Sequence, residues 1–187
     1  MEEHIESVTK KLKAVSAALF KAKYCLDSST LKVIYYALVY SHLSYGIVVW
    51  GTAYETHLKE LNCLHKRILK STLKGVDNNH LVDCMKIERI MNLSEIYDYN
   101  ASVYGYRIHK KMFNNTQVKL RIICNNADFY GKSNFDVFYQ ESIKTEFARR
   151  SISYGIAKSY NATNDNIRKL PLYSSFKRNL KKIILTR

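Results

Sequence analysis

The chain has 187 residues, 47% of them hydrophobic, which is enough apolar material for a buried core and excludes a wholly disordered protein. Thirty lysines and arginines against 16 aspartates and glutamates leave a formal net charge of +14, which indicates a polyanionic partner, either nucleic acid or an anionic membrane surface. One proline and six glycines offer few tight turns, so composition argues against an all-β protein and favours a mainly α fold.

The cysteines and the amino terminus bear on the cellular compartment. Four cysteines are scattered without a Cys-x-x-Cys pair, and the first 20 residues alternate charged with apolar positions, unlike a signal peptide. No run of 18 apolar residues exists, so no transmembrane segment is expected. These features predict an intracellular protein of the nucleus or cytoplasm, with reduced thiols.

The first half of the chain predicts helices. An apolar stripe with spacings of three and four predicts a helix over 3–24, and the run Asp27-Ser-Ser-Thr30 offers N-cap candidates for a second helix over 31–43. That second helix is apolar on most sides, so we expect it to be buried on several faces. Residues 45–51 fit either a strand or a continuing helix. The stripe of the first helix comprises Ile5, Val8, Leu12, Val15, Leu19 and Ala22.

Further helices are predicted over 54–74, 80–86 and 95–113. Gly75 opens a turn and is the expected C-cap of the first of these, and Ser94 is the expected N-cap of the last. The sequence thus predicts a helical bundle over residues 1–113.

Residues 114–187 form a predicted second region, which is less regular and basic. No sustained period is present over 114–150, where one short strand or hairpin is expected near 136–142. Pro171 is the expected start of a terminal helix, since proline suits a first turn. The apolar seam of that helix comprises Phe176, Leu180, Ile183 and Ile184.

Basic residues recur at helical spacing and are the candidate nucleic-acid-binding residues. Such faces can track phosphates without reading sequence, although a solvated helix face or, for 172–187, a membrane-surface helix has the same pattern. Eleven basic and three acidic residues lie between Glu141 and Arg187. The candidates are Lys66, Arg67, Lys70 and Lys74 in one helix, the pair Arg149 and Arg150, and Lys177, Arg178, Lys181 and Lys182 in the terminal helix.

Tyrosines beside basic residues are secondary candidates. Tyr24, Tyr154 and Tyr173 could stack on the bases of a single strand, although packing in the core explains tyrosines more often.

No catalytic residue and no metal site is predicted. Four residues could in principle supply zinc ligands, but their spacing matches no common finger, and two partly buried thiols with two surface imidazoles explain them better. His42 has no nucleophile or carboxylate near it in the sequence, so a hydrogen-bonded histidine at a helix end is the expected role. The zinc candidates are Cys63, His65, His80 and Cys84.

Several motifs together resemble a known family. They are the block from Thr30 to Gly51, which contains His42-Leu-Ser-Tyr-Gly46 and Val49-Trp-Gly51, the run Lys66-Arg-Ile-Leu69, the block around Arg149-Arg-Ser-Ile-Ser-Tyr154 with Asn161, and the closing segment Leu172–Leu185. This pattern resembles the thumb and C-terminal region of reverse transcriptases of non-LTR retrotransposons, transposable elements of the jockey/CR1-type LINE group. The sequence departs from it where Ser159-Tyr160 stands for Leu-Trp and Thr163-Asn164 for Leu-Pro.

The resemblance implies a thumb-like bundle that grips the template–product duplex of an RNA-directed DNA polymerase. The palm of that family carries metal-binding aspartates, including an adjacent pair, and this chain contains no Asp-Asp dipeptide. No cofactor is therefore expected, because Mg²⁺ would belong to the missing palm, and the chain alone is not expected to polymerise.

The implied partners are RNA or DNA, bound through the backbone, and the missing palm and fingers. Two other interpretations stay open. One is a truncated enzyme whose palm is encoded upstream, and the other is a domesticated or relic helical protein that binds other proteins through its apolar seams.

Overall fold

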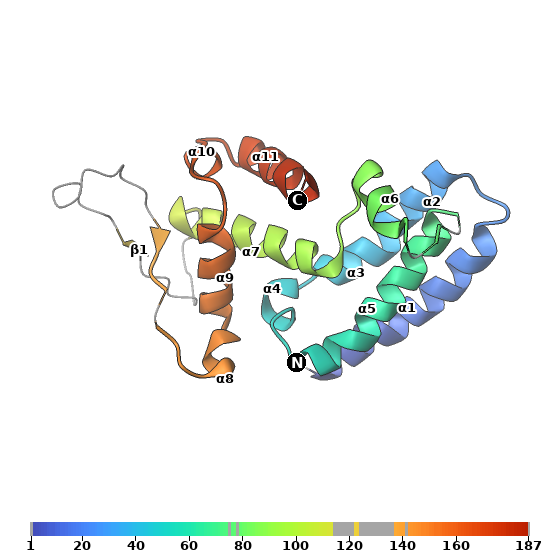
Figure 1. The fold of residues 1–187 in the computed structure, drawn as a ribbon, viewed down its shortest axis with the longest axis horizontal. Coiled ribbons are helices and arrows are strands. Elements are labelled where there is room, and N and C mark those ends of the chain that lie inside the picture. The colour runs from blue at the N-terminus through green and yellow to red at the C-terminus, as the bar shows by residue number, and fades with distance from the viewer. Residues whose placement is uncertain are drawn as a thin grey trace. The chain divides into compact units, whose positions relative to one another are not determined.

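The computed structural model describes residues 2–74, 76–77, 79–113, 122–123, 137–140 and 142–186. The fold is mainly α, as predicted, and the one sheet of the described residues has two short strands. The chain divides into two compact units, Met1–Tyr97 and Asp98–Leu185 (Figure 1). The division falls within helix α7 (Leu93–His109), and the domain boundary expected after residue 113 stays a prediction. None of the described helices is long and apolar enough to span a membrane.

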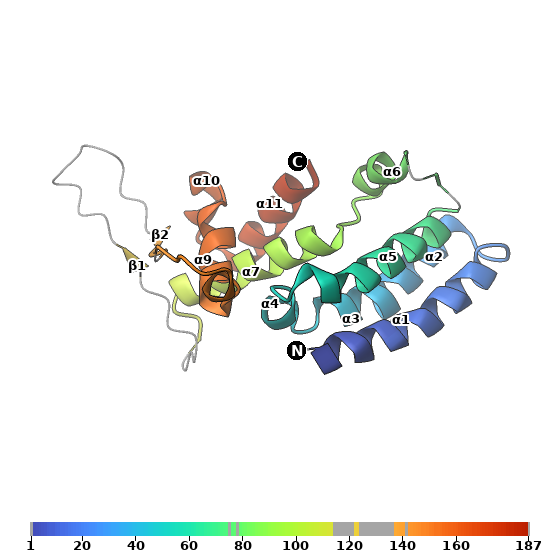
Figure 2. The ribbon, with the colours of Figure 1, turned by 60° about the horizontal axis from the view of Figure 1, so that its bottom comes forward.

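The first unit is built around two long helices, α1 (Glu2–Ala22) and α5 (Glu55–Thr72), which run side by side in the same direction (Figure 1, Figure 2). At their starts His57 Nε2 lies 2.9 Å from Glu2 Oε1. The predicted stripe of the first helix is buried except for Val15 and Ala22, which are half-buried. The elements of this unit are α1 (Glu2–Ala22), α2 (Ser28–Ile34), η1 (Tyr35–Tyr40), α3 (Ser41–Ser44), α4 (Ile47–Trp50), α5 (Glu55–Thr72) and α6 (Leu81–Ile87), followed by the start of α7.

Asp27 caps the second helix, as predicted. Its carboxylate accepts hydrogen bonds from the backbone N–H groups of Ser29 and Thr30 at 3.0 and 3.1 Å. Hydrogen bonds from the Ser29 and Thr30 hydroxyls and from the Thr30 backbone hold the pKa of the Asp27 carboxyl well below its usual range. The helix therefore begins at Ser28, earlier than the predicted start at residue 31.

From α2 to α3 the helix is continuous, and its middle, η1, is a π-helix. Leu31, Tyr35, Val39 and Leu43 follow at intervals of four residues, and each side chain is fully buried. An α-helical turn takes 3.6 residues, so a spacing of four repeated three times would rotate the seam away from the core. The wider π turn keeps these side chains on one face.

The prediction that this helix is buried on several faces is wrong. Val33 is 68% exposed and Leu38 is 46% exposed, so only one face lies in the core. Apolar residues on all sides predict a buried helix only if something covers every side. Nothing within the described part of the first unit covers this face.

Residues 45–51 were open between strand and helix, and they form the short helix α4. Gly46 precedes it with φ +62°, a left-handed conformation that favours glycine. Gly51 ends it where an added Cβ would lie 2.5 Å from the Ile47 carbonyl oxygen. The indole N–H of Trp50 donates to the Tyr45 carbonyl at 2.8 Å. The single tryptophan is buried, and this bond stabilises the turn that precedes α4.

Helices α5, α6 and α7 match the predicted ranges closely, but Ser94 is not the N-cap of α7. The backbone N–H of Glu95 donates to the Asn92 side chain at 2.9 Å, and the Asn92 N–H donates to the Glu95 carboxylate at 2.8 Å. This reciprocal pair is a capping box, which places Ser94 inside the helix. The expected C-cap of α5, Gly75, lies outside the described residues.

The second unit gathers around the end of α7. The Tyr106 ring stacks on Phe176 with centroids 4.1 Å apart, and the Tyr106 hydroxyl donates to the Leu170 carbonyl at 2.7 Å. The terminal helix begins at Tyr173, just after Pro171, and buries Phe176, Leu180 and Ile184 of its predicted seam. The elements after α7 are β1 (Ile122–Ile123), β2 (Val137–Phe138), α8 (Glu146–Arg149), α9 (Ile152–Asn161), α10 (Asp165–Arg168) and α11 (Tyr173–Thr186).

The strand expected near 136–142 is present as β2, which pairs in antiparallel fashion with β1. Most of the predicted irregular stretch 114–150 lies outside the described residues. Helices α9 and α10 were not predicted from periodicity. Helix α9 buries Ile156, Ala157 and Tyr160 but also Gly155 and Ser159, and such small or polar residues blur an apolar stripe.

A histidine–tyrosine pair lies in the core of the first unit. The His65 ring is stacked on Tyr35 with centroids 5.9 Å apart, and His65 Nε2 is 2.9 Å from the Tyr35 hydroxyl oxygen. Burial lowers the pKa of His65 to about 4 and raises that of the Tyr35 hydroxyl above its usual range. Both side chains are therefore neutral in the folded protein near neutral pH.

We expect the buried His65 to make the first unit less stable in acid. The unfolded His65 binds a proton below about pH 6.5, whereas the folded one stays neutral down to about pH 4. We expect the free energy of unfolding to fall by up to about 3 kcal/mol as the pH drops through this window, since one pKa unit is about 1.4 kcal/mol. Urea titrations followed by Trp50 fluorescence measure the free energy of unfolding at each pH.

The matched variants are His65→Gln, which removes the titrating ring but keeps a polar partner for Tyr35, and His80→Gln at an exposed position. The first should flatten the pH dependence and the second should leave it unchanged. A wild-type unfolding free energy that is constant between about pH 6.5 and pH 4 would contradict the assignment.

Candidate nucleic-acid interface

Helix α5 has a sharp division between apolar and basic faces. Its buried side includes Leu61, Leu64 and Ile68, which pack in the core with α1. The four predicted basic residues lie on other sides of the helix or just beyond its end, where Lys66, Arg67 and Lys74 are exposed and Lys70 is half-buried. We call Lys66, Arg67, Lys70 and Lys74 the α5 basic row.

No residue of the α5 basic row makes an ion pair with a carboxylate of the part of the chain that the structure describes. Elsewhere in the same unit lysines do find acidic partners, since Lys13 Nζ lies 2.6 Å from Glu60 Oε1 and Lys32 Nζ lies 2.8 Å from Glu88 Oε2. The positive potential of the row is therefore not cancelled locally. Such a row can bind phosphates without first breaking internal salt bridges.

The two arginines at the end of α8, Arg149 in its last turn and Arg150 at its C-cap, differ from that row because they share one acidic neighbour. Arg150 Nη2 lies 3.2 Å from Glu146 Oε1, and Arg149 Nη1 lies 3.9 Å from Glu146 Oε2. Arg149 is exposed and Arg150 is half-buried. Part of their charge is thus neutralised within the helix.

The basic residues of α11 surround its buried seam. Arg178 and Lys182 are exposed one turn apart, whereas Lys177 and Lys181 are half-buried. The Lys177 ammonium lies 5.3 Å from the centroid of the Tyr173 ring, so its chain lies along its own helix. Of the four predicted residues, Arg178 and Lys182 are the most open to a ligand.

Not all the candidate binding residues belong to the same unit. The α5 basic row belongs to the first unit, and the α8 and α11 residues belong to the second. Each group is therefore a separate candidate surface. The α5 basic row is the most favourable of them, because three of its four residues are exposed, all four are closely spaced, and none pairs with a carboxylate of the described residues.

The three candidate stacking tyrosines have different environments. Tyr24 is 74% exposed and lies beside Phe20 and Lys23 at the end of α1. Tyr154 and Tyr173 are half-buried in the second unit. Sequence reasoning missed Phe20, although it lies outside the apolar stripe of α1 and is four residues from Tyr24, and both signals were available.

The zinc candidates do not form a site. His65 is buried and bonded to Tyr35, while Cys63, two residues earlier on the same helix, is exposed. His80 is also exposed. Among the residues that the structure describes, no three His, Cys, Asp or Glu side chains gather as a group that could hold a metal ion.

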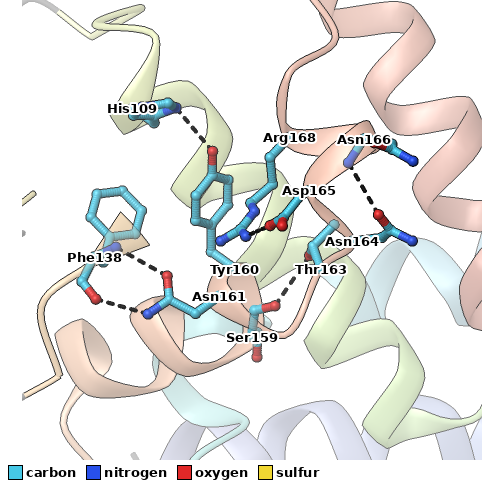
Figure 3. Close-up of polar contacts among 10 residues, drawn as sticks. All are labelled: His109, Phe138, Ser159, Tyr160, Asn161, Thr163, Asn164, Asp165, Asn166 and Arg168. Carbon is cyan, nitrogen blue, oxygen red and sulfur yellow. Dashed lines mark hydrogen bonds and ion pairs between the residues drawn. The ribbon is translucent and has the colours of Figure 1, made fainter. Parts of the chain in front are cut away.

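Asn161 has a structural role in the second unit, where its side chain joins α9 to β2. Figure 3 shows the Asn161 amide facing the backbone of Phe138, where its oxygen accepts the Phe138 N–H at 3.0 Å and its nitrogen donates to the Phe138 carbonyl at 2.8 Å. The side chain thus makes the pair of bonds that a neighbouring strand would make. It holds β2 against α9.

Tyr160 and Arg168 make further contacts beside Asn161. Tyr160 is fully buried, and its hydroxyl oxygen lies 2.9 Å from His109 Nδ1 (Figure 3). The Arg168 guanidinium pairs with Asp165 and lies 5.9 Å from the Tyr160 ring centroid. An aromatic side chain therefore fills the core at the position where the retrotransposon pattern has tryptophan.

No protein-family model, no curated protein and no solved structure matches this chain. The resemblance to non-LTR reverse transcriptases therefore stays a prediction from the sequence motifs.

Replacing Asn161 should loosen the second unit. We expect Asn161→Ala to lower its free energy of unfolding by about 2 kcal/mol, because two backbone groups of Phe138 lose their partner. Thermal unfolding followed by circular dichroism measures the change. Asn166→Ala, at an exposed position nearby, should change stability by less than about 0.5 kcal/mol. If the two variants lower the free energy of unfolding equally, the structural role of the Asn161 side chain is contradicted.

Proposed function

We propose that this chain is a non-catalytic thumb and C-terminal fragment of a non-LTR retrotransposon RNA-directed DNA polymerase, and that it binds the backbone of RNA or DNA electrostatically. The observation that carries the binding proposal is the α5 basic row, with four cations and no carboxylate partner among the described residues. The excess charge of the whole chain supports it. The polymerase origin is supported by the sequence motifs alone.

The binding mechanism would be charge neutralisation of phosphates. Each lysine or arginine that contacts a phosphate releases condensed counterions, so affinity falls steeply with salt and depends little on base sequence. Lys66 and Lys70 are four residues apart and Arg67 and Lys70 are three apart, so these cations are neighbours on the surface of α5, and Lys74 follows just beyond the end of the helix. This geometry suits a groove-following or backbone-following contact.

No chemical step is assigned to this chain. It has no adjacent aspartate pair, and the carboxylates of the described residues form no cluster that could hold the two metal ions of a polymerase. Under this proposal, Mg²⁺ and the reacting groups belong to the palm of the polymerase, which is itself a proposed partner.

The alternative function is a protein-interaction module, and one observation favours it. The α2–η1 helix exposes Val33 and Leu38, and α6 exposes Val82 and Ile87. Such apolar side chains are typical of surfaces that another protein covers. Binding to a protein that is insensitive to salt, with no binding to nucleic acid, would favour this function.

The first prediction for the interface concerns salt dependence. We expect the wild-type chain to bind a labelled RNA–DNA duplex at about 50 mM salt and to lose much of that affinity at about 200 mM. The variant Lys66→Ala/Arg67→Ala/Lys70→Ala should bind more weakly and should lower the slope of log affinity against log salt by about three, one for each phosphate contact removed. Fluorescence anisotropy measures both quantities.

The control variant is Lys10→Ala/Lys11→Ala/Lys86→Ala, which removes the same charge from exposed positions outside the α5 basic row. It should retain most of the affinity and of the slope. If it weakens binding as much as the first variant, net charge and not the row is responsible. A folded wild-type sample that does not bind at about 50 mM salt would disprove the proposed function.

A further inference from the structure

The end of α1 carries an exposed aromatic pair with a cation beside it. Phe20 is 52% exposed and Tyr24 is 74% exposed, and their rings meet edge to face with centroids 6.1 Å apart. The Lys23 ammonium lies 4.3 Å from the Phe20 centroid and 4.9 Å from the Tyr24 centroid. We call Phe20, Lys23 and Tyr24 the aromatic platform.

The backbone under the platform is fixed. The N–H of Lys23 donates to the Leu19 carbonyl at 3.0 Å, and those of Cys25 and Leu26 donate to the Ala22 carbonyl at 3.0 and 2.9 Å. Leu19 is itself buried in the core of the first unit. The backbone that carries the rings is therefore held by hydrogen bonds, so no backbone ordering is needed when a ligand stacks on them.

The surroundings of the platform are basic. Lys21 is exposed on the preceding turn, and the nearby Asp27 carboxylate is engaged as the N-cap of α2. Because α1 and α5 run side by side in the same direction, their C-terminal ends lie at the same end of the pair (Figure 2), and Lys70 belongs to the last turn of α5. The aromatic platform and the C-terminal part of the α5 basic row thus belong to the same end of the helix pair.

Exposed aromatic rings next to lysines suit one ligand chemistry in particular. A nucleobase has a flat π face that stacks on tyrosine, and its phosphate takes an ammonium group, so a nucleotide satisfies both parts of the platform. A paired base within a duplex offers no free face. An apolar protein surface would use the rings but would have to desolvate Lys21 and Lys23.

We infer that the aromatic platform binds an unpaired nucleotide of a nucleic-acid strand that lies along the α5 basic row, with its base stacked on Tyr24 and its phosphate held by Lys23. This inference rests on the proposed nucleic-acid binding and adds to it a preference for single-stranded ends or overhangs. The base is bound by its π face, so the site does not select a sequence.

The test compares Tyr24→Leu with the wild-type chain on three labelled probes of about 12 nucleotides: a single-stranded RNA, a blunt duplex, and an abasic strand that keeps the phosphates. Leucine keeps an apolar side chain but has no π face, and Tyr24→Phe restores it. We expect Tyr24→Leu to bind the single-stranded RNA about tenfold more weakly, with Tyr24→Phe close to the wild type. The salt slope should not change, because no phosphate contact is removed.

The matched control is Tyr45→Leu, since Tyr45 is equally exposed in the same unit, but no lysine or arginine of the described residues lies over its ring. It should bind all three probes as the wild type does, and the abasic strand and blunt duplex should not distinguish Tyr24→Leu from the wild type. Circular dichroism confirms that each variant is folded.

Three outcomes would overturn the inference. If Tyr24→Leu binds the single-stranded RNA as tightly as the wild type, the platform does not stack a base, and the α5 basic row remains the proposed site. An equal loss on all three probes would assign Tyr24 a structural role. A wild-type chain that binds none of the probes would remove the proposed function and the inference together.

Discussion

The apolar seam between α1 and α5 is the constraint on which the first unit depends. Leu12 and Leu19 of one helix and Leu61 and Ile68 of the other are almost fully buried, and each such side chain contributes about 1.5–3 kcal/mol relative to exposure. Once these residues face inward, helical geometry leaves the lysines of both helices no place but the surface. The basic surface is therefore a consequence of core packing.

The second unit is held together in a different way. Its core is aromatic, with Tyr106 stacked on Phe176 and Tyr160 buried beside His109. The hydroxyl groups of both tyrosines also make hydrogen bonds. Asn161 joins a strand to a helix by side-chain hydrogen bonds. Such an arrangement depends on directional contacts, so it tolerates a change of a single side chain less well than an apolar seam does.

The sequence predicts best what periodicity encodes. Helices α1, α5 and α11 and the Asp27 cap follow from spacing and local chemistry, and the α5 basic row follows from the same spacing. Periodicity does not encode what covers a face, which is why Val33 and Leu38 were expected inside. It also missed α9, whose buried face includes Ser159, and the Asn92 cap. The contact between Phe20 and Tyr24 depends on the turn after α1, which periodicity does not predict.

The π-helix of η1 also says something about how this chain changes in length. The buried residues Leu31, Tyr35, Val39 and Leu43 are spaced 4-4-4, and taking out Ala37 would leave a spacing of 4-3-4, the ordinary rhythm of an α-helix. The spacing of the buried residues in this π-helix is therefore the spacing of an α-helix with one residue inserted. Loss of one residue here would leave the buried side chains at α-helical spacing, whereas the same loss in α1 would turn the apolar stripe beyond it away from α5.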